Sequence, residues 1–144
     1  NVYCGSWRTR ISGNTFCRIG LLAALAGCGD AFSPPEGAER WYPPPVVFDN
    51  LWGQTEGCSQ LSGDMQRVRW YVVPGTTAFP CAWGNCRGVW AAPHNIYLSD
   101  AAAHNLFLED FFTVRHEMLH DLVGHAGHPP VFEQCGLMSR DSIG

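Results

Sequence analysis

The sequence predicts an α+β fold in which a small twisted sheet packs on one long helix. Short β-branched and aromatic segments precede the only long stretch with helical periodicity, and an irregular tail follows that stretch. Strands that precede a helix, instead of alternating with helices, are typical of this class. At 144 residues the chain is long enough for one ordinary domain and too short for two.

The composition argues against a disordered chain and against a nucleic-acid-binding protein. Apolar residues make up 46% of the sequence and charged residues only 15%, so a packed core is expected. The formal net charge is −4, and the nine basic residues form no basic stripe of the kind that binds nucleic acid.

Residues 1–27 have the pattern of a signal peptide. A positively charged region precedes an apolar run over residues 19–26, which is too short to span a bilayer as a mature helix. The basic residues are Arg8, Arg10 and Arg18. Residues 1–7 could lie upstream of the true start. The alternative is a buried helix, rich in Ala and Leu, that ends at Gly27.

The apolar run ends in Leu25-Ala26-Gly27-Cys28, which resembles the lipobox of bacterial lipoproteins. The resemblance implies cleavage before Cys28, lipidation of Cys28, and anchoring of the exported chain to a membrane of the bacterial cell envelope. Residues 28–45, which are rich in Pro and Gly, would form an extended linker behind that anchor. The folded domain then covers residues 46–144.

Four cysteines remain beyond Cys28, and they are Cys58, Cys81, Cys86 and Cys135. An even number in an oxidising compartment predicts two disulfides. Of the three pairings, we favour Cys81–Cys86 around a tight turn, with Cys58–Cys135 joining distant parts of the domain. The alternative is a cysteine-based zinc site, but Cys81 and Cys86 lack the short spacing usual for one.

Within the domain, we expect strands at residues 67–73, 88–91 and 94–98, where β-branched and aromatic residues gather between turn residues. The long helix is expected over about Ala103–Val123, because apolar residues recur there at steps of three and four. Gly124 stands in the position of a helix C-cap.

The helix carries a pattern suited to metal chemistry. His116 and His120 are four residues apart, so their side chains lie one turn apart on the same face and can share one Zn²⁺. Glu117 follows the first His, where its carboxylate can reach a metal-bound water without ligating the metal. This arrangement predicts metal-assisted hydrolysis with Glu117 as the general base.

A third ligand must come from outside the helix. Gly124 allows the chain to turn back, and His128 has enough chain beyond the turn to return to the metal. His128 is therefore favoured over His125, which follows the turn directly. Glu133 is the third choice.

The C-terminal part of the chain resembles the metzincin clan of zinc peptidases, whose signature is H-E-x-x-H-x-x-G-x-x-H followed by a Met-turn beneath the metal. His116, Glu117 and His120 match the first part of the signature, and Met138 stands where the resemblance implies a Met-turn. Gly124 comes one residue late and His128 two residues late, so the loop to the third ligand is longer here.

The clan's substrate-binding edge strand would correspond to Ile96-Tyr97-Leu98. The expectation is thus a zinc metallopeptidase: an exported endopeptidase that cleaves peptide bonds by Glu117-assisted attack of zinc-bound water. The expected partners are a peptide or protein substrate and the membrane that holds the lipid anchor, with the protein acting as a monomer. The alternatives are a zinc hydrolase of a non-peptide amide bond, a non-catalytic metal-binding lipoprotein, and an inactive relative that only binds partners.

Further residues are weaker candidates. Asp121 could hold a ligand ring by a hydrogen bond. Three side chains could stabilise an oxyanion, and they are Tyr97, His104 and Arg140. Four tryptophans are expected in the core or along a cleft, and they are Trp52, Trp70, Trp83 and Trp90.

Overall fold

The computed structural model of the chain describes residues 32–104 and 108–138, with the backbone alone at 108–110. All of these belong to the second of two compact units, which spans Phe32–Gly144. The strands are β1 (Glu39–Arg40), β2 (Arg69–Val73), β3 (Phe79–Cys81), β4 (Gly84–Cys86), β5 (Gly88–Ala91) and β6 (Asn95–Ser99). The helices are α1 (Val47–Ser59), the 3₁₀ turn η1 (Met65–Arg67), α2 (Asp100–His104), α3 (Leu108–Val123) and α4 (Val131–Gln134). The α+β class is confirmed.

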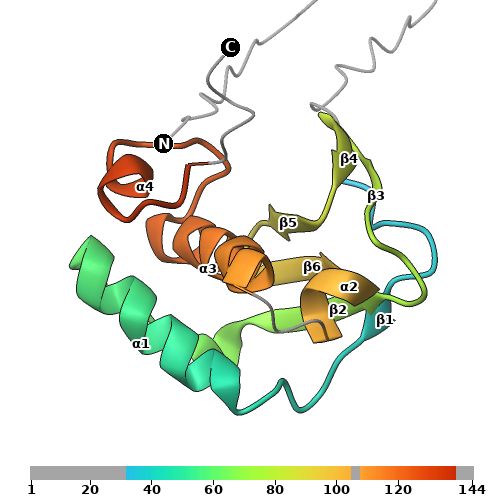
Figure 1. Cartoon of the computed structure of the whole chain (residues 1–144), viewed down its shortest axis with the longest axis horizontal. Coiled ribbons are helices and arrows are strands. Elements are labelled where there is room, and N and C mark those ends of the chain that lie inside the picture. Colours follow the sequence, from blue (N-terminus) through green and yellow to red (C-terminus); the bar gives the residue numbers. More distant parts are fainter. Residues whose placement is uncertain (1–31, 105–107, 139–144) are drawn as a thin grey trace, which may run out of the picture. The chain divides into compact units, whose positions relative to one another are not determined.

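Four strands form one sheet in the order β1-β2-β6-β5, and β3 pairs with β4 as a separate hairpin (Figure 1). The central strands β2 and β6 are parallel, with Trp70 opposite Ile96, whereas β1 and β5 are antiparallel to their neighbours. The expectation that residues 96–98 form an edge strand is wrong, because β6 lies inside the sheet. The edge beside α3 is β5.

The expected strands are present, with shifted starts. The segment expected at 67–73 begins as a strand only at Arg69. The preceding turn η1 is capped by Asp64, whose carboxylate accepts a hydrogen bond of 2.9 Å from the Gln66 N–H. The segment at 88–91 is β5 as expected, and the one at 94–98 is β6, which begins one residue later.

The predicted long helix is two helices. Residues 100–104 form the short helix α2, and α3 begins at Leu108. The helix ends where expected, because Gly124 has a φ of +74°, a conformation that costs glycine little. The Gly124 N–H donates a 2.8 Å hydrogen bond to the His120 carbonyl, and this bond caps the last turn of the helix.

The sequence pattern did not predict the helix α1. Its buried side chains are Phe48, Leu51, Trp52 and Thr55, a spacing that places them on one face. Gly53 and Gly57 lower the intrinsic helix propensity of the segment. Burial of the apolar face against α3 therefore outweighs local propensity.

Alternation along β6 divides the core between the two faces of the sheet. Ile96 and Leu98 join the larger cluster, with residues from the helices α1, α2 and α3. Tyr97 points to the other face, where it packs with Val73 and with Phe79 of the β3–β4 hairpin. The hairpin thus covers one face of the sheet while the helices cover the other.

The end of the expected linker belongs to the packed domain. In β1, Glu39 and Arg40 pair with β2, and the Trp41 N–H donates a 2.9 Å hydrogen bond to the Trp70 carbonyl. The Trp41 ring also meets Phe48 edge-on, with ring centroids 5.6 Å apart. The expectation of an extended segment without packing is therefore wrong from about residue 39 onward.

The four domain cysteines pair as the sequence favours. Cys58, at the end of α1, pairs with Cys135, just beyond α4, with their Cα atoms 5.6 Å apart. Cys81 pairs with Cys86 across the β3–β4 hairpin, with a Cα separation of 5.9 Å. The first pair ties α1 to the C-terminal segment, and the second closes the hairpin.

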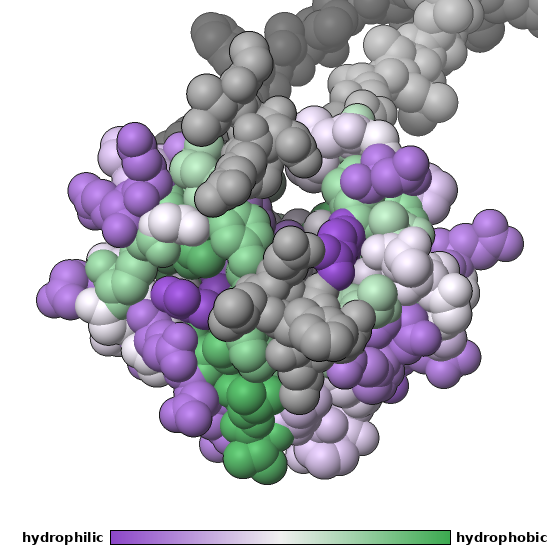
Figure 2. Space-filling model, viewed as in Figure 1, coloured by the Kyte–Doolittle hydropathy of each residue, from purple (hydrophilic) through white to green (hydrophobic). Residues whose placement is uncertain are grey.

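The surface drawn in Figure 2 carries hydrophilic residues on both sides of a band of hydrophobic residues. Some large apolar side chains are well exposed, among them Val46 and Trp83. None of the helices within residues 32–104 and 108–138 combines the length and hydropathy that a bilayer span requires. The expected signal peptide and Cys28 lie outside the described residues.

Candidate metal centre

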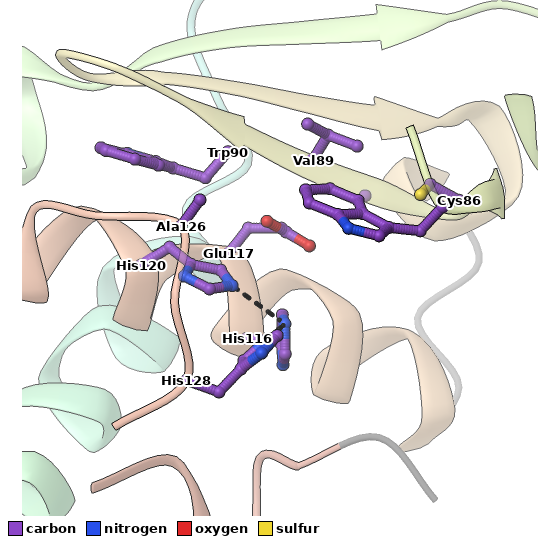
Figure 3. Close-up of a pocket in the computed structure, with 10 residues that line it drawn as sticks. Cys86, Val89, Trp90, His116, Glu117, His120, Ala126 and His128 are labelled. Atoms are coloured by element: carbon purple, nitrogen blue, oxygen red, sulfur yellow. Dashed lines mark hydrogen bonds between the residues drawn. The ribbon is translucent and has the colours of Figure 1, made fainter. Parts of the chain in front are cut away.

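Three imidazoles converge at one point beside α3 (Figure 3). His116 and His120 project from successive turns of the helix, and His128 returns to them from the following loop. The Nε2 atom of His116 lies 3.2 Å from that of His120 and 3.1 Å from that of His128. The ligand atoms of the three residues all lie within 4.8 Å of one another, so the group could hold a metal ion.

The loop after α3 explains why His128, and not His125, reaches this point. Gly124 turns the chain, and the exposed His125 ring then faces its own loop, where Nδ1 accepts a 3.0 Å hydrogen bond from the Gly127 N–H. The His125 carbonyl instead accepts a hydrogen bond from His120. Glu133, the third choice, is exposed on α4 and outside the cluster.

Backbone carbonyls fix the protonation of two rings. His116 Nδ1 lies 2.6 Å from the Leu137 carbonyl oxygen, and His120 Nδ1 lies 3.0 Å from that of His125. A carbonyl only accepts, so each Nδ1 must carry the proton and each Nε2 must present its lone pair to the cluster. Such hydrogen bonds are the usual means of orienting metal-ligating histidines.

The spacing of the Nε2 atoms suits a tetrahedral ion. Two nitrogens at about 2.0–2.1 Å from Zn²⁺, separated by a tetrahedral angle, would be about 3.3 Å apart. The observed 3.1 and 3.2 Å are close to that value. The lone pairs of His116 and His120, 3.2 Å apart with no proton between them, repel each other unless a cation lies beside them.

The electrostatics favour neutral rings, which metal binding requires. Burial, together with the neighbouring His116 ring, lowers the pKa of His120 to about 3, although the hydrogen bond with the His125 carbonyl opposes that shift. Burial also lowers the pKa of His116, although the hydrogen bond with the Leu137 carbonyl opposes that shift. Both rings are therefore neutral at neutral pH, with their one proton on Nδ1.

Phe132 contacts all three ligand rings. It is fully buried at the start of α4, with ring centroids 5.1, 4.6 and 4.9 Å from those of His116, His120 and His128. Met138 is half-buried beside it in the cluster of Leu119, Phe132 and Leu137. The sequence pointed to Met138 and missed Phe132, because the contacts of Phe132 with His116 and His120 join separate segments of the fold.

Glu117 lies between the imidazoles and β5 (Figure 3). Its side chain is buried, which raises its pKa to about 8 against the effect of a hydrogen bond from the Trp90 backbone. The strand can approach this closely only because residue 88 is a glycine. A Cβ there would lie 2.9 Å from Glu117 Cγ and 3.0 Å from Glu117 Oε1.

Asp121 binds the strand side of the site and not a ligand ring, contrary to expectation. Its buried carboxylate accepts a 2.9 Å hydrogen bond from Trp90 Nε1 and one of 3.0 Å from His94 Nδ1. The Trp90 ring in turn stacks on His120 at a centroid distance of 6.3 Å. The carboxylate thereby joins α3 to β5 and to the turn before β6.

A cavity of about 420 Å³ opens over the cluster. Its polar lining consists of the three histidines and Glu117. Its other lining residues are Trp83, Cys86, Gly88, Val89, Trp90 and Ala126. A substrate in this cavity would lie between the β5 strand and the three imidazoles.

The remaining candidates lie elsewhere. Tyr97 stacks on Tyr71 at 4.6 Å on the opposite face of the sheet, so strand alternation excludes it from the cavity. His104 bonds Asp100 at 2.7 Å and does not line the cavity. Trp52 and Trp70 are in the core. Arg140 lies outside the described residues.

Comparison with family models, curated proteins and solved structures finds no match for this chain.

Proposed function

We propose that the protein is a zinc-dependent hydrolase that acts as an endopeptidase. The observation that carries this proposal is the convergence of three imidazoles beside the buried Glu117 side chain at the floor of an open cavity. A storage site would need the histidines but has no use for a carboxylate held against a strand beside them. An inert relative would not need it either.

Zinc is the metal that this donor set favours. Three imidazoles, without a thiolate or a carboxylate in the group, suit borderline metals and form one of the three-ligand sets of catalytic zinc sites. Such a set leaves a fourth position open. When bound there, Zn²⁺ would polarise a substrate carbonyl and acidify a water molecule.

The chain's own residues supply the rest of the chemistry. The positive charge of a bound Zn²⁺ would favour the ionised form of Glu117 over the neutral acid that burial favours. The carboxylate would then accept the proton of the attacking water and pass it to the leaving amine. Gly88 and the Trp90 backbone hold the Glu117 carboxylate between β5 and the imidazoles. Phe132 packs against all three ligand rings, and these contacts restrict the rings to their mutual geometry.

A peptide bond is the favoured substrate because β5 is the edge strand beside the site. Its only neighbour in the described sheet is β6. The Trp90 N–H is engaged by Glu117, and the other backbone groups on that outer edge can pair with an extended chain. Such pairing would lay the backbone of a peptide along the cavity that Gly88, Val89 and Trp90 line. A metzincin-like enzyme with a longer third-ligand loop fits this arrangement.

Export to the cell envelope with a lipid anchor at Cys28 remains part of the proposal. The two cysteine pairs of the domain support an oxidising compartment.

The test is the Glu117→Gln variant of the zinc-loaded full chain, assayed on a mixture of synthetic peptides. The amide keeps the size of the side chain but cannot accept the proton, so hydrolysis should fall by roughly 10²–10⁴-fold with the zinc content unchanged. Glu133→Gln, on the exposed side of α4, is the matched control and should keep full activity. Equal activity in both variants would refute the proposed role. Cleavage of non-peptide amides alone would change the substrate class.

A further inference from the structure

Trp83 is exposed, unlike most of the tryptophans within residues 32–104 and 108–138. Its side chain is 76% exposed, whereas Trp52, Trp70 and Trp90 are buried. Trp83 lies in the turn between β3 and β4 and belongs to none of the three hydrophobic clusters. An indole in water contributes little to the stability of the fold, so packing of the core does not explain the position of Trp83.

The β3–β4 hairpin that carries Trp83 is held by a disulfide and by a buried side chain. Cys81 and Cys86 pair across it, and Phe79, opposite Cys86 in the β3–β4 register, is buried among residues of the sheet. The turn that carries Trp83 is therefore held in place before any ligand arrives. Binding at a residue on a held backbone costs less conformational entropy than binding at a residue on a mobile loop, which favours the use of Trp83 as a contact residue.

Trp83 lines the same cavity as the three histidines and Glu117. Cys86, Val89 and Ala126 share this lining, so the walls around the metal-binding group are apolar. A peptide that fills the cavity of about 420 Å³ therefore meets an indole on one side and the site on the other. Large apolar side chains match such a wall, and charged ones do not.

We propose that Trp83 is a specificity-determining residue, whose indole contacts a large apolar side chain of the peptide substrate and so selects peptides that carry one near the cleaved bond. The proposal rests on the peptidase function above and names the substrate class of that site.

Binding can be measured without turnover in the zinc-loaded full chain that carries Glu117→Gln. The probes are six labelled hexapeptides in which a single Phe occupies each position in turn of a Gly/Ala background, with the peptide lacking Phe as reference. Fluorescence anisotropy gives each dissociation constant. At one position or more, Phe should tighten binding by about tenfold, and Trp83→Ala should remove that gain. Trp83→Phe should retain most of it.

Tyr42→Ala is the control for loss of an exposed aromatic ring, because Tyr42 is 79% exposed and does not line the cavity. It should leave every dissociation constant unchanged. A Phe gain of equal size in Trp83→Ala, or no Phe gain at any position, would overturn the proposal. The same peptides given to the chain with Glu117 intact report hydrolysis separately. Binding that depends on Trp83 without any cleavage would instead count against the peptidase.

Discussion

Two histidines follow α3, and only one of them faces His116 and His120. His128 Nε2 lies 3.1 Å from His116 Nε2, whereas the His125 ring is engaged by the Gly127 N–H. The two residues differ in role although they are three positions apart. His125 acts through its backbone, because its carbonyl orients the His120 ring.

This difference predicts the metal affinity of two matched variants. His128→Ala removes one of three ligands and should weaken zinc binding by orders of magnitude. His125→Ala keeps the carbonyl that orients His120, so its zinc affinity should change by less than about tenfold. Competition with a chromogenic chelator measures both. Equal loss in the two variants, or greater loss in His125→Ala, would contradict the ligand assignment.

Gly88 provides a second prediction at the scale of single residues. In Gly88→Ala the new Cβ would lie 2.9 Å from Glu117 Cγ and 2.9 Å from Thr113 Cγ2, so strand and helix must move apart. Peptide hydrolysis should fall by at least about tenfold, since small displacements of a catalytic group are costly, while zinc content stays at the wild-type level. Gly57→Ala, which has open space around its Cβ, is the control and should keep full activity.

At the scale of elements, the two cysteine pairs close chain segments of very different length. Cys58 and Cys135 are 77 residues apart in the sequence, and Cys81 and Cys86 are five apart. The longer loop restricts the unfolded chain more, so its bridge should contribute more to stability. It also ties α4 to α1, and α4 carries Phe132, which contacts the three ligand rings.

The double variant Cys58→Ser/Cys135→Ser should therefore lose about 4 kcal/mol of unfolding free energy, against about 2 kcal/mol for Cys81→Ser/Cys86→Ser. Urea denaturation of both variants under oxidising conditions measures the difference. A larger loss in the hairpin variant would contradict this reading of the two pairs.

The elements that the sequence predicted are those with strong local patterns. The helix end at Gly124 and most of the strand expected at 67–73 follow from residue type alone. The helix α1 was missed because its two glycines weaken the local pattern and its stability comes from packing on α3. The edge strand was misplaced because the order β2-β6-β5 depends on long-range pairing, which no local pattern encodes.

The same limit applies to the site, where local spacing could be predicted from the sequence and contacts between distant segments could not. Ligand spacing on one helix is a local property, so His116, Glu117 and His120 could be identified from the sequence. The contacts of Phe132 with the rings join separate segments of the fold and could not be identified in that way. The same is true of the close approach of Gly88 to Glu117.

At the scale of the whole molecule, the domain is preceded by a segment that we expect to direct export. Cleavage before Cys28 and its lipidation would place the domain at a membrane surface. In a bacterial host, Cys28→Ser should leave an unprocessed precursor or a protein that no longer fractionates with membranes. Fractionation and mass spectrometry of the full chain measure both. Equal membrane partition and processing in the variant would refute the anchor and leave the metal centre unaffected.

The proposed function depends most on a metal ion held by the three imidazoles of His116, His120 and His128 with one coordination position open. X-ray absorption at the zinc edge of the zinc-loaded full chain tests it directly. The predicted spectrum has three imidazole nitrogens and one further light atom at about 2.0–2.1 Å. Sulfur scattering at about 2.3 Å, or a first shell with fewer than three imidazoles, would contradict the assignment of His116, His120 and His128 as the ligands.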